Sequence, residues 1–255
     1  MKLFFREYGD GPPVVLLHGL LASSDNWFTI ARLLSDTYRV IAPDLRNHGV
    51  SPHSDDFDFS LLSADIRELI ERLNLRKPFI VGHSLGGKTA MELSLSFPDI
   101  PRAVVLEDII PGETVPISGR YIRLLQELDL GKVVLRRDAE ERLLEKEKDR
   151  RVVRFLLKNL LRNEDGIYTW KANLDALLVN YEKLWKGLES DRSWDGPALF
   201  IRGGQSDVVP DESFEEILSF FPRAQIVTIG STGHWVHGDA ADEFVGHLRR
   251  FFSSV

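Results

Sequence analysis

Cysteine is absent from this chain of 255 residues, and several other features are scarce. Without a thiol there is no disulfide, thiolate nucleophile, iron–sulfur cluster or cysteine-ligated zinc. No apolar run approaches the roughly 20 residues that span a bilayer, and charges interrupt the N-terminal stretch before a signal peptide forms. Basic residues (32) are outnumbered by acidic ones (39), which argues against phosphate attraction by a nucleic-acid binder. We therefore expect a cytoplasmic protein that binds neither membranes nor nucleic acid.

The residues that are present favour a folded globular protein. Hydrophobic residues make up 43% of the chain, charged residues 28%, and the formal net charge is −7. A chain of this length buries roughly 70–75% of its unfolded surface. Its length predicts one or two domains.

Short apolar runs alternate with helical patterns in both terminal parts of the chain. This alternation predicts βαβ units and a mostly parallel central sheet flanked by helices, an α/β fold. The predicted strands are Val14–Leu17, Arg39–Ala42, Phe79–Val81, Ala103–Leu106, Ala198–Ile201 and Ile226–Ile229. The predicted helices are Trp27–Leu34, Leu61–Leu73, Leu85–Ser96, Ser213–Phe220 and Ala240–Phe251.

The middle of the chain, from Pro111 to Ser190, has helical patterns and no convincing strand. Such an insertion is expected to cover the carboxyl edge of the sheet, where ligands bind in open α/β folds. We predict a core of residues 1–110 and 191–255 and an all-helical lid of residues 111–190. The predicted lid helices are Ile117–Leu128, Ala139–Lys148, Val152–Leu161 and Lys171–Trp185.

The strongest chemical signal is GHSLGG at residues 82–87. It has the G-x-S-x-G pattern, and it stands between a predicted strand and a predicted helix, the context of a nucleophile elbow. Glycines flank the serine because a sharp strand-to-helix turn leaves no room for side chains. The pattern predicts Ser84 as a nucleophile.

A serine nucleophile needs a neighbouring base. Among seven histidines, His234 follows the last predicted strand, in the order expected for a hydrolase of this pattern. His237 is the alternative base. The chain thus offers a histidine late in the sequence to activate Ser84.

The acid that orients the histidine has two candidates at strand ends. Asp207 follows the predicted strand Ala198–Ile201, and Asp108 follows Ala103–Leu106. The position of these residues alone leaves the choice between them open.

The oxyanion hole is expected to consist of two backbone N–H groups. One belongs to Leu85, directly after the nucleophile, and the other to Leu20, in the loop after the first predicted strand. We also expect four residues to line the substrate pocket: His18, Gly19, His83 and Trp235. No cofactor and no metal are expected.

Four segments together resemble one branch of the α/β-hydrolase superfamily. They are RNHG at 46–49, SPHS at 51–54, GHSLGGK at 82–88 and GHWVH at 233–237. This YbfF-type esterase and thioesterase branch includes the mitochondrial α/β-hydrolase domain-containing protein eleven. The resemblance extends over nearly the whole chain.

The resemblance implies hydrolysis of short to medium acyl esters or thioesters without a cofactor. It also implies that the triad acid follows the strand before the lid, which favours Asp108, although this chain has an acid at Asp207 as well. Members of the branch lack an acid there.

We therefore predict a serine carboxylesterase or acyl thioesterase that acts on a small molecule through an acyl-enzyme on Ser84. The oligomeric state, monomer or homodimer, stays open. Three alternatives remain: a carbon–carbon bond hydrolase, a cofactor-free perhydrolase, and a non-catalytic receptor that retains the triad.

Overall fold

The computed structural model describes residues 1–114, 119–188 and 191–255. Within them one sheet of seven strands has the order β1-β3-β2-β4-β5-β8-β9. β1 (Phe5–Tyr8) is antiparallel to β3, and the other neighbours are parallel. The predicted mostly parallel sheet is therefore confirmed. The parallel strands are β2 (Pro13–Leu17), β3 (Arg39–Pro43), β4 (Phe79–His83), β5 (Ala103–Glu107), β8 (Ala198–Gly203) and β9 (Ala224–Ile229).

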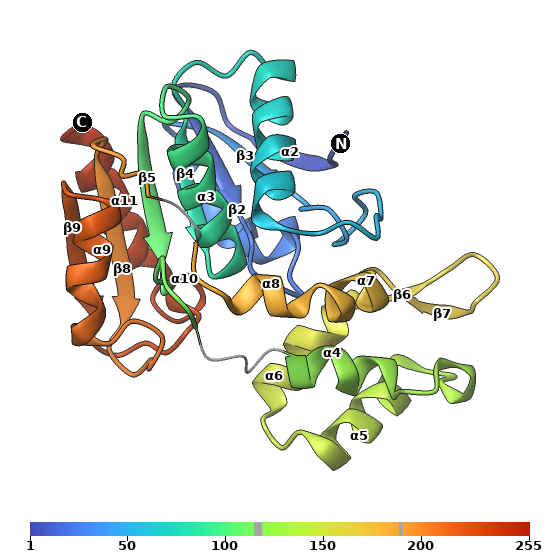
Figure 1. Ribbon diagram of the computed structural model, residues 1–255. Helices are drawn as coiled ribbons and strands as arrows, with labels where there is room; N and C mark the ends of the chain where they lie inside the picture. Colours follow the sequence, from blue (N-terminus) through green and yellow to red (C-terminus); the bar gives the residue numbers. More distant parts are fainter. Residues whose placement is uncertain (115–118, 189–190) are drawn as a thin grey trace.

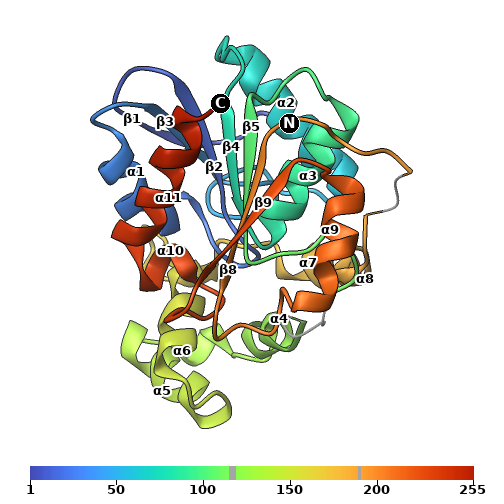
Figure 2. The same cartoon turned by 90° about the vertical axis from the view of Figure 1, so that its left-hand side faces the viewer.

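Helices cover both faces of this sheet (Figure 2). One face carries α1 (Phe28–Leu34), α10 (Val236–Asp239) and α11 (Ala241–Ser253), and the other carries α2 (Phe59–Arg72), α3 (Leu85–Ser96) and α9 (Phe214–Phe220). Short 3-10 helices lie at Ser24–Trp27, Leu130–Lys132, Leu157–Asn159 and Asp211–Ser213. The layers match those of an α/β fold.

Each strand contributes to two apolar cores because successive side chains point to opposite faces. In β2, Val14 and Leu16 belong to the core under α1 and α11, whereas Val15 and Leu17 belong to the core on the opposite face. All four side chains are fully buried. The near-continuous apolar runs of the sequence are therefore strands covered on both sides.

The chain between β5 and β8 forms an insertion below the carboxyl ends of the strands (Figure 1). Its helices are α4 (Gly119–Gln126), α5 (Arg136–Lys146), α6 (Arg150–Leu156), α7 (Leu174–Val179) and α8 (Tyr181–Trp185). The predicted helix Ile117–Leu128 begins in residues 117–118, which lie outside the described residues.

The expectation of an all-helical insertion is wrong at one place. β6 (Leu160–Arg162) and β7 (Tyr168–Trp170) form an antiparallel hairpin, so the predicted helix Val152–Leu161 ends early. Ile167 N–H closes the turn by donating to Asn163 Oδ1 at 2.7 Å. Strands of three residues are too short to show an alternating pattern, because a period of two needs four or more residues.

The carboxyl-terminal half of the insertion is hydrogen-bonded to the core. Asn159 Nδ2 donates to the carbonyl of Leu21 at 2.7 Å, and Asn173 N donates to the carbonyl of Asn47 at 3.0 Å. One side-chain amide and one backbone N–H thus donate to core carbonyls that burial would otherwise leave without a donor. This half of the insertion thus has fixed polar contacts below the sheet.

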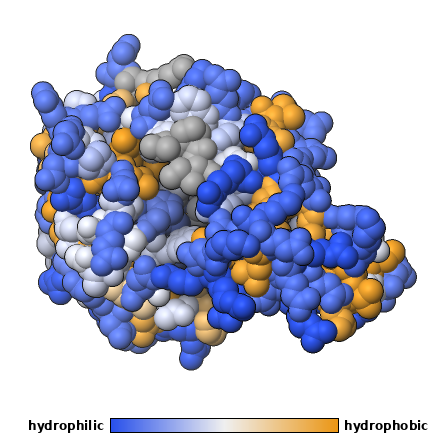
Figure 3. Space-filling view, turned by 90° about the horizontal axis from the view of Figure 1, so that it is seen from below, coloured by the Kyte–Doolittle hydropathy of each residue, from blue (hydrophilic) through white to orange (hydrophobic). Residues whose placement is uncertain are grey.

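The outer face of the insertion is mostly hydrophilic, with separate apolar spots (Figure 3). Its exposed apolar side chains include Val134, Leu135, Ile167 and Val179. Single exposed apolar residues are ordinary on protein surfaces. In the described parts of the chain, no helix combines the length and hydrophobicity required to span a bilayer.

Candidate active site

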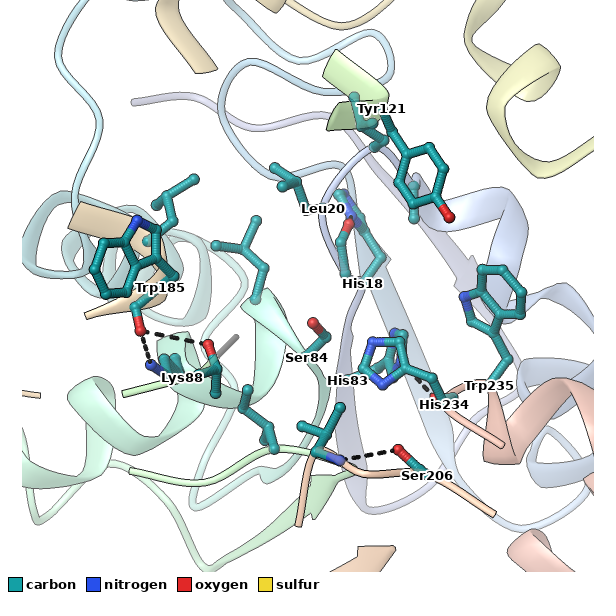
Figure 4. A pocket seen from close by; sticks show the side chains of 18 of the residues that line it. His18, Leu20, His83, Ser84, Lys88, Tyr121, Trp185, Ser206, His234 and Trp235 are labelled. Carbon is teal, nitrogen blue, oxygen red and sulfur yellow. Dashed lines mark hydrogen bonds between the residues drawn. The ribbon is translucent and has the colours of Figure 1, made fainter. Parts of the chain in front are cut away.

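Ser84 lies at the turn between β4 and α3, in a backbone conformation that side chains rarely adopt. Its φ is 51° and its ψ is −115°, and its N–H donates to the carbonyl of Glu107 at 3.1 Å. A Cβ at Gly82 would collide with the carbonyl of Gly86, and a Cβ at Gly86 would collide with that of Leu17. The glycines of the motif are therefore required by close backbone approach. The turn projects the Ser84 hydroxyl into a cavity (Figure 4).

His234 and Asp108 meet at the same edge of the sheet. His234 follows β9, Asp108 follows β5, and the distance from His234 Nδ1 to Asp108 Oδ2 is 2.8 Å. The Asp108 side chain is fully buried, whereas that of His234 is 36% exposed. Nδ1 therefore faces the carboxylate, an arrangement that leaves Nε2 for proton transfer.

Two further donors orient the Asp108 carboxylate. The N–H of Gly203 donates to Oδ1 at 3.0 Å, and the Ser206 hydroxyl donates to Oδ2 at 2.5 Å. Both donors belong to the end of β8 and the loop after it. Asp108 thus connects the loops after β5, β8 and β9.

Asp207 has a different environment. It lies in the loop after β8, is exposed, and lines the same cavity as Ser84 and His234. The carboxylate bonded to the His234 imidazole is that of Asp108. The geometry therefore favours Asp108 as the partner of His234, and Asp207 as a residue of the cavity wall.

The two expected oxyanion donors flank the cavity that Ser84 lines. Leu85 is the first residue of α3, where a backbone N–H has no partner within the helix. Leu20 also lines this cavity (Figure 4).

At Gly19, a Cβ would approach the Nδ1 atom of His83 to 2.8 Å. A side chain at Gly19 would therefore displace the loop or the elbow.

His18 supports the loop that carries Leu20. Its Nε2 accepts from the N–H of Leu45 at 2.9 Å, and its Nδ1 lies 2.8 Å from the carbonyl of Gly19. Nδ1–H is therefore the donor to Gly19, and the ring is neutral. His18 lines the cavity as expected, and its bonds give it a positioning role as well.

His83 links the elbow to the loop of His234. Its Nε2 lies 2.9 Å from the carbonyl of His234, and the centroids of the two rings are 4.6 Å apart. Burial lowers the pKa of His83 to about 3, so the neutral ring donates this hydrogen bond. The elbow thereby fixes the backbone of the histidine that it faces.

A second carboxylate–imidazole pair lies beside the first. Glu107, fully buried on β5, accepts from the backbone N–H of His237 at 2.8 Å and from its Nδ1 at 2.7 Å. Burial raises the pKa of Glu107, but the interactions with His237 and His83 outweigh it and hold the pKa below its usual value. His237, the alternative base, is thus bonded to Glu107 and holds the start of α10. Glu107 was not predicted from the sequence as a residue of the site, although a carboxylate on a buried strand, directly before Asp108, indicates such a role.

The cavity has a volume of about 510 Å³ and lies between the core and the insertion. The expected pocket residues His18, Gly19, His83 and Trp235 all line it. Its apolar lining residues include Leu21, Ile109, Tyr121, Val152, Phe155, Leu184 and Trp185. The size suits a small organic ligand that is mostly apolar. Within residues 1–114, 119–188 and 191–255, no group of three or more His, Asp or Glu could hold a metal ion.

Three buried histidines are expected to destabilise the protein in acid. Burial lowers the pKa of His48 and of His83 to about 3 and also lowers that of His18. Below the usual pKa of 6.5, the unfolded chain binds protons at these groups and the folded chain does not. The free energy of unfolding should therefore fall as the pH decreases below 6.5, by up to about 1.4 kcal/mol per pH unit for each histidine.

Urea unfolding at a series of pH values measures this effect, and NMR of the imidazole protons follows each ring. Constant unfolding free energy from neutral pH to about pH 4.5, or protonation of these rings close to their usual pKa, would contradict the expected burial.

Comparisons with known proteins agree with this architecture. A family model described as alpha/beta hydrolase fold matches residues 12–241. The chain is 38% identical over 253 residues to the sn-1-specific diacylglycerol lipase ABHD11 of Xenopus tropicalis, covering 96% of this chain and 79% of that protein. It is 31% identical to esterase YbfF of Escherichia coli, covering 94% and 93%. A solved structure of a marine microorganism esterase superimposes with a TM-score of 0.96 at 37% identity, covering 98% and 99%.

These matches confirm the resemblance that the four sequence segments indicate. They extend beyond those segments to nearly the whole length of the chain. The chain belongs to the α/β-hydrolase family and, within it, to the branch of esterase- and lipase-type hydrolases that includes ABHD11 and YbfF.

Proposed function

We propose that the protein is a serine esterase that cleaves short to medium acyl esters through an acyl-enzyme on Ser84. The observation that carries the proposal is the convergence of Ser84, His234 and Asp108 on one largely apolar cavity. Hydrolase-type chemistry follows from the family. The substrate class and the role of each residue are the proposed part.

The reaction proceeds in two halves. Ser84 Oγ attacks the acyl carbonyl while His234 Nε2 accepts the hydroxyl proton, and Asp108 stabilises the imidazolium through Nδ1–H. The oxyanion accepts hydrogen bonds from the N–H groups of Leu20 and Leu85. Collapse of the tetrahedral intermediate expels the alcohol, which takes the proton from His234. Water, deprotonated by His234, then attacks the acyl-enzyme. The second tetrahedral intermediate collapses, Ser84 Oγ leaves with the proton from His234, and the acid is released.

The acyl chain binds along the apolar wall of the cavity. Aromatic side chains of the insertion form part of this wall, with Tyr121 from α4, Phe155 from α6 and Trp185 from α8. Residues 111–190 therefore act as a lid, of which 115–118 and 189–190 lie outside the described residues. Because the insertion contributes these aromatic side chains to the wall, the lid shapes acyl-chain preference together with the core residues that line the cavity.

The name of the ABHD11 relatives adds a candidate substrate, the sn-1 ester of a diacylglycerol. A thioester differs only in its leaving group, because the attack on the acyl carbonyl is the same.

The cytoplasmic location stays a prediction.

A fluorophosphonate probe should label Ser84 stoichiometrically, because an activated serine attacks phosphorus as it attacks an acyl carbon. Peptide mass spectrometry identifies the site, and Ser84→Ala should lose the label. A series of p-nitrophenyl esters should show highest kcat/KM at short to medium acyl chains.

Each alternative gives a different result in the same assays. Diacylglycerol and acyl thioesters, assayed in parallel, identify the leaving group. Ligand binding without multiple turnover would instead indicate a receptor, and acyl transfer to hydrogen peroxide in preference to water would indicate a perhydrolase. Turnover of a carbon–carbon substrate with inert esters would indicate a carbon–carbon bond hydrolase. Absence of labelling in folded protein would contradict the serine mechanism altogether.

A further inference from the structure

Lys88 is a buried cation that the proposed mechanism does not use. It lies on α3, one turn after Ser84, and only 1% of it is exposed. Its Nζ donates to three backbone carbonyls, those of Gly112 at 2.8 Å, Lys186 at 2.7 Å and Trp185 at 3.3 Å. An ammonium has three N–H donors, so these three carbonyls account for all of them.

The three acceptors belong to the two places where the insertion joins the core. We define residues 111–114 as the first hinge segment and residues 184–188 as the second. The segments are hydrogen-bonded to each other, from Thr114 N to the carbonyl of Trp185 and from Leu188 N to that of Pro111, both at 2.9 Å. Lys88 is a core side chain that donates to both segments at once. Figure 4 shows Lys88 beside Trp185, on the same cavity as Ser84.

The direct polar contacts of the Lys88 ammonium are its hydrogen bonds to the three carbonyls, and the carboxylates around it act through their charge. Glu216 on α9 and Glu113 in the first hinge segment are the carboxylates whose charges act on it, and the ring centroid of Phe59 on α2 lies 5.9 Å from Nζ. A buried ammonium is costly, and an apolar side chain would avoid that cost while leaving three carbonyls without this donor. The position therefore favours hydrogen bonding to the hinge segments over packing.

We propose that Lys88 is a positioning residue that holds the two hinge segments together and thereby sets the shape of the acyl-binding cavity. The proposal rests on the function proposed above for that cavity. Helix α3 carries Ser84 at its start, and the second hinge segment carries Trp185 and Leu184 in the cavity wall. Lys88 thus fixes the distance between the nucleophile and the wall that binds the acyl chain.

Lys88→Met tests this role, because it keeps most of the side-chain volume and removes every donor. We expect KM for the preferred ester to rise about tenfold, as loss of charge-assisted hydrogen bonds predicts, with kcat within about threefold. Hydrogen exchange should accelerate in peptides that cover the hinge segments and stay unchanged in β5. The fluorophosphonate should still label Ser84.

A pH series separates this role from general stabilisation. Burial lowers the pKa of Lys88 to about 8, against the opposing charges of Glu216 and Glu113. The neutral amine keeps two N–H donors for three carbonyls. The KM of the unmodified protein should therefore rise toward that of Lys88→Met as the pH increases through about 8, while the KM of the variant stays flat.

Lys186→Met is the matched control. Its ammonium is half exposed and lies 3.1 Å from Glu182, whereas only its backbone carbonyl accepts from Lys88. This variant should retain the KM, the hinge exchange and the pH response of the unmodified protein.

Two results would overturn the proposal. One is unchanged KM and unchanged hinge exchange in Lys88→Met, and the other is a loss of kcat with constant KM. If the variant does not fold, hydrogen exchange of the unmodified protein is compared at about pH 7 and pH 9.5, after correction for intrinsic exchange rates. An increase in exchange rate that is no larger in the hinge segments than in β5 contradicts the role of Lys88. The exchange experiment needs no substrate. Failure of the esterase proposal alone would therefore show as absent labelling with the hinge response intact.

Discussion

Ser84→Ala is expected to lower kcat for a p-nitrophenyl ester by on the order of 10⁶-fold, as removal of the nucleophile does in serine hydrolases. The chain contains no cysteine to replace the serine. Residual catalysis from binding and the oxyanion hole should remain above the rate in water. Steady-state hydrolysis by separately purified variants measures the loss. Ser60→Ala, at an exposed serine on α2, should retain full activity.

Ser84→Gly tests, in addition to the loss of activity, whether the backbone at Ser84 is strained. Ser84 has a φ of 51°, a conformation that glycine adopts without a steric penalty. The glycine variant should be as inactive as the alanine variant but more stable, by about 1 kcal/mol in urea unfolding. More than a hundredth of the original kcat in either variant would contradict the assignment of Ser84. Equal stability of the glycine and alanine variants would show that the turn is not strained.

Much of the fold could be predicted from the sequence because its strands are buried on both faces. Runs such as Val14–Leu17 and Ala103–Leu106 are continuous and apolar, and helical patterns separate them. β1 escaped prediction because it is an edge strand with the charged residues Arg6 and Glu7 at its centre. Its antiparallel pairing with β3 depends on a partner distant in sequence, which no local pattern records.

The insertion was harder to predict because its elements are short. The pattern Lys171–Trp185 predicts one helix, but the structure has α7 and α8, with Asn180 between them. The side chain of Asn180 donates to the carbonyl of Asp55 in the core at 2.8 Å. A tertiary hydrogen bond thus accompanies the break, and helical periodicity contains no information about such a contact.

The candidate site could be predicted only as far as local motifs reach. The elbow around Ser84 and the loop of His234 have glycine patterns that indicate sharp turns. Glu107 lies 130 positions from His237 in the sequence, and Lys88 lies 98 positions from Lys186 in the second hinge segment. Such contacts arise from the order of strands in the sheet, so the sequence shows the residues without showing their partners.

Asp108→Asn is expected to lower kcat by about 10³–10⁴-fold, because an amide facing His234 Nδ1 stabilises the wrong tautomer and cannot stabilise the imidazolium. Asp207→Asn should change kcat by less than about threefold, because the exposed carboxylate of Asp207 is not the partner of His234. The two substitutions are chemically identical and lie at loops after neighbouring strands. Steady-state kinetics of both variants, with urea unfolding as a check on folding, compares them directly.

Ser206→Ala tests how far catalysis depends on the hydrogen bond from the loop after β8 that orients the Asp108 carboxylate. This variant removes one donor to Asp108 Oδ2, at 2.5 Å, but keeps the carboxylate and its bond to Gly203. We expect kcat to fall by about tenfold to a hundredfold, in line with the loss of one hydrogen bond to a charged group. A loss in Asp207→Asn larger than that in Asp108→Asn would assign the acid to Asp207. Small losses in both would mean that His234 acts without either carboxylate, because a true acid accounts for several kcal/mol of transition-state stabilisation.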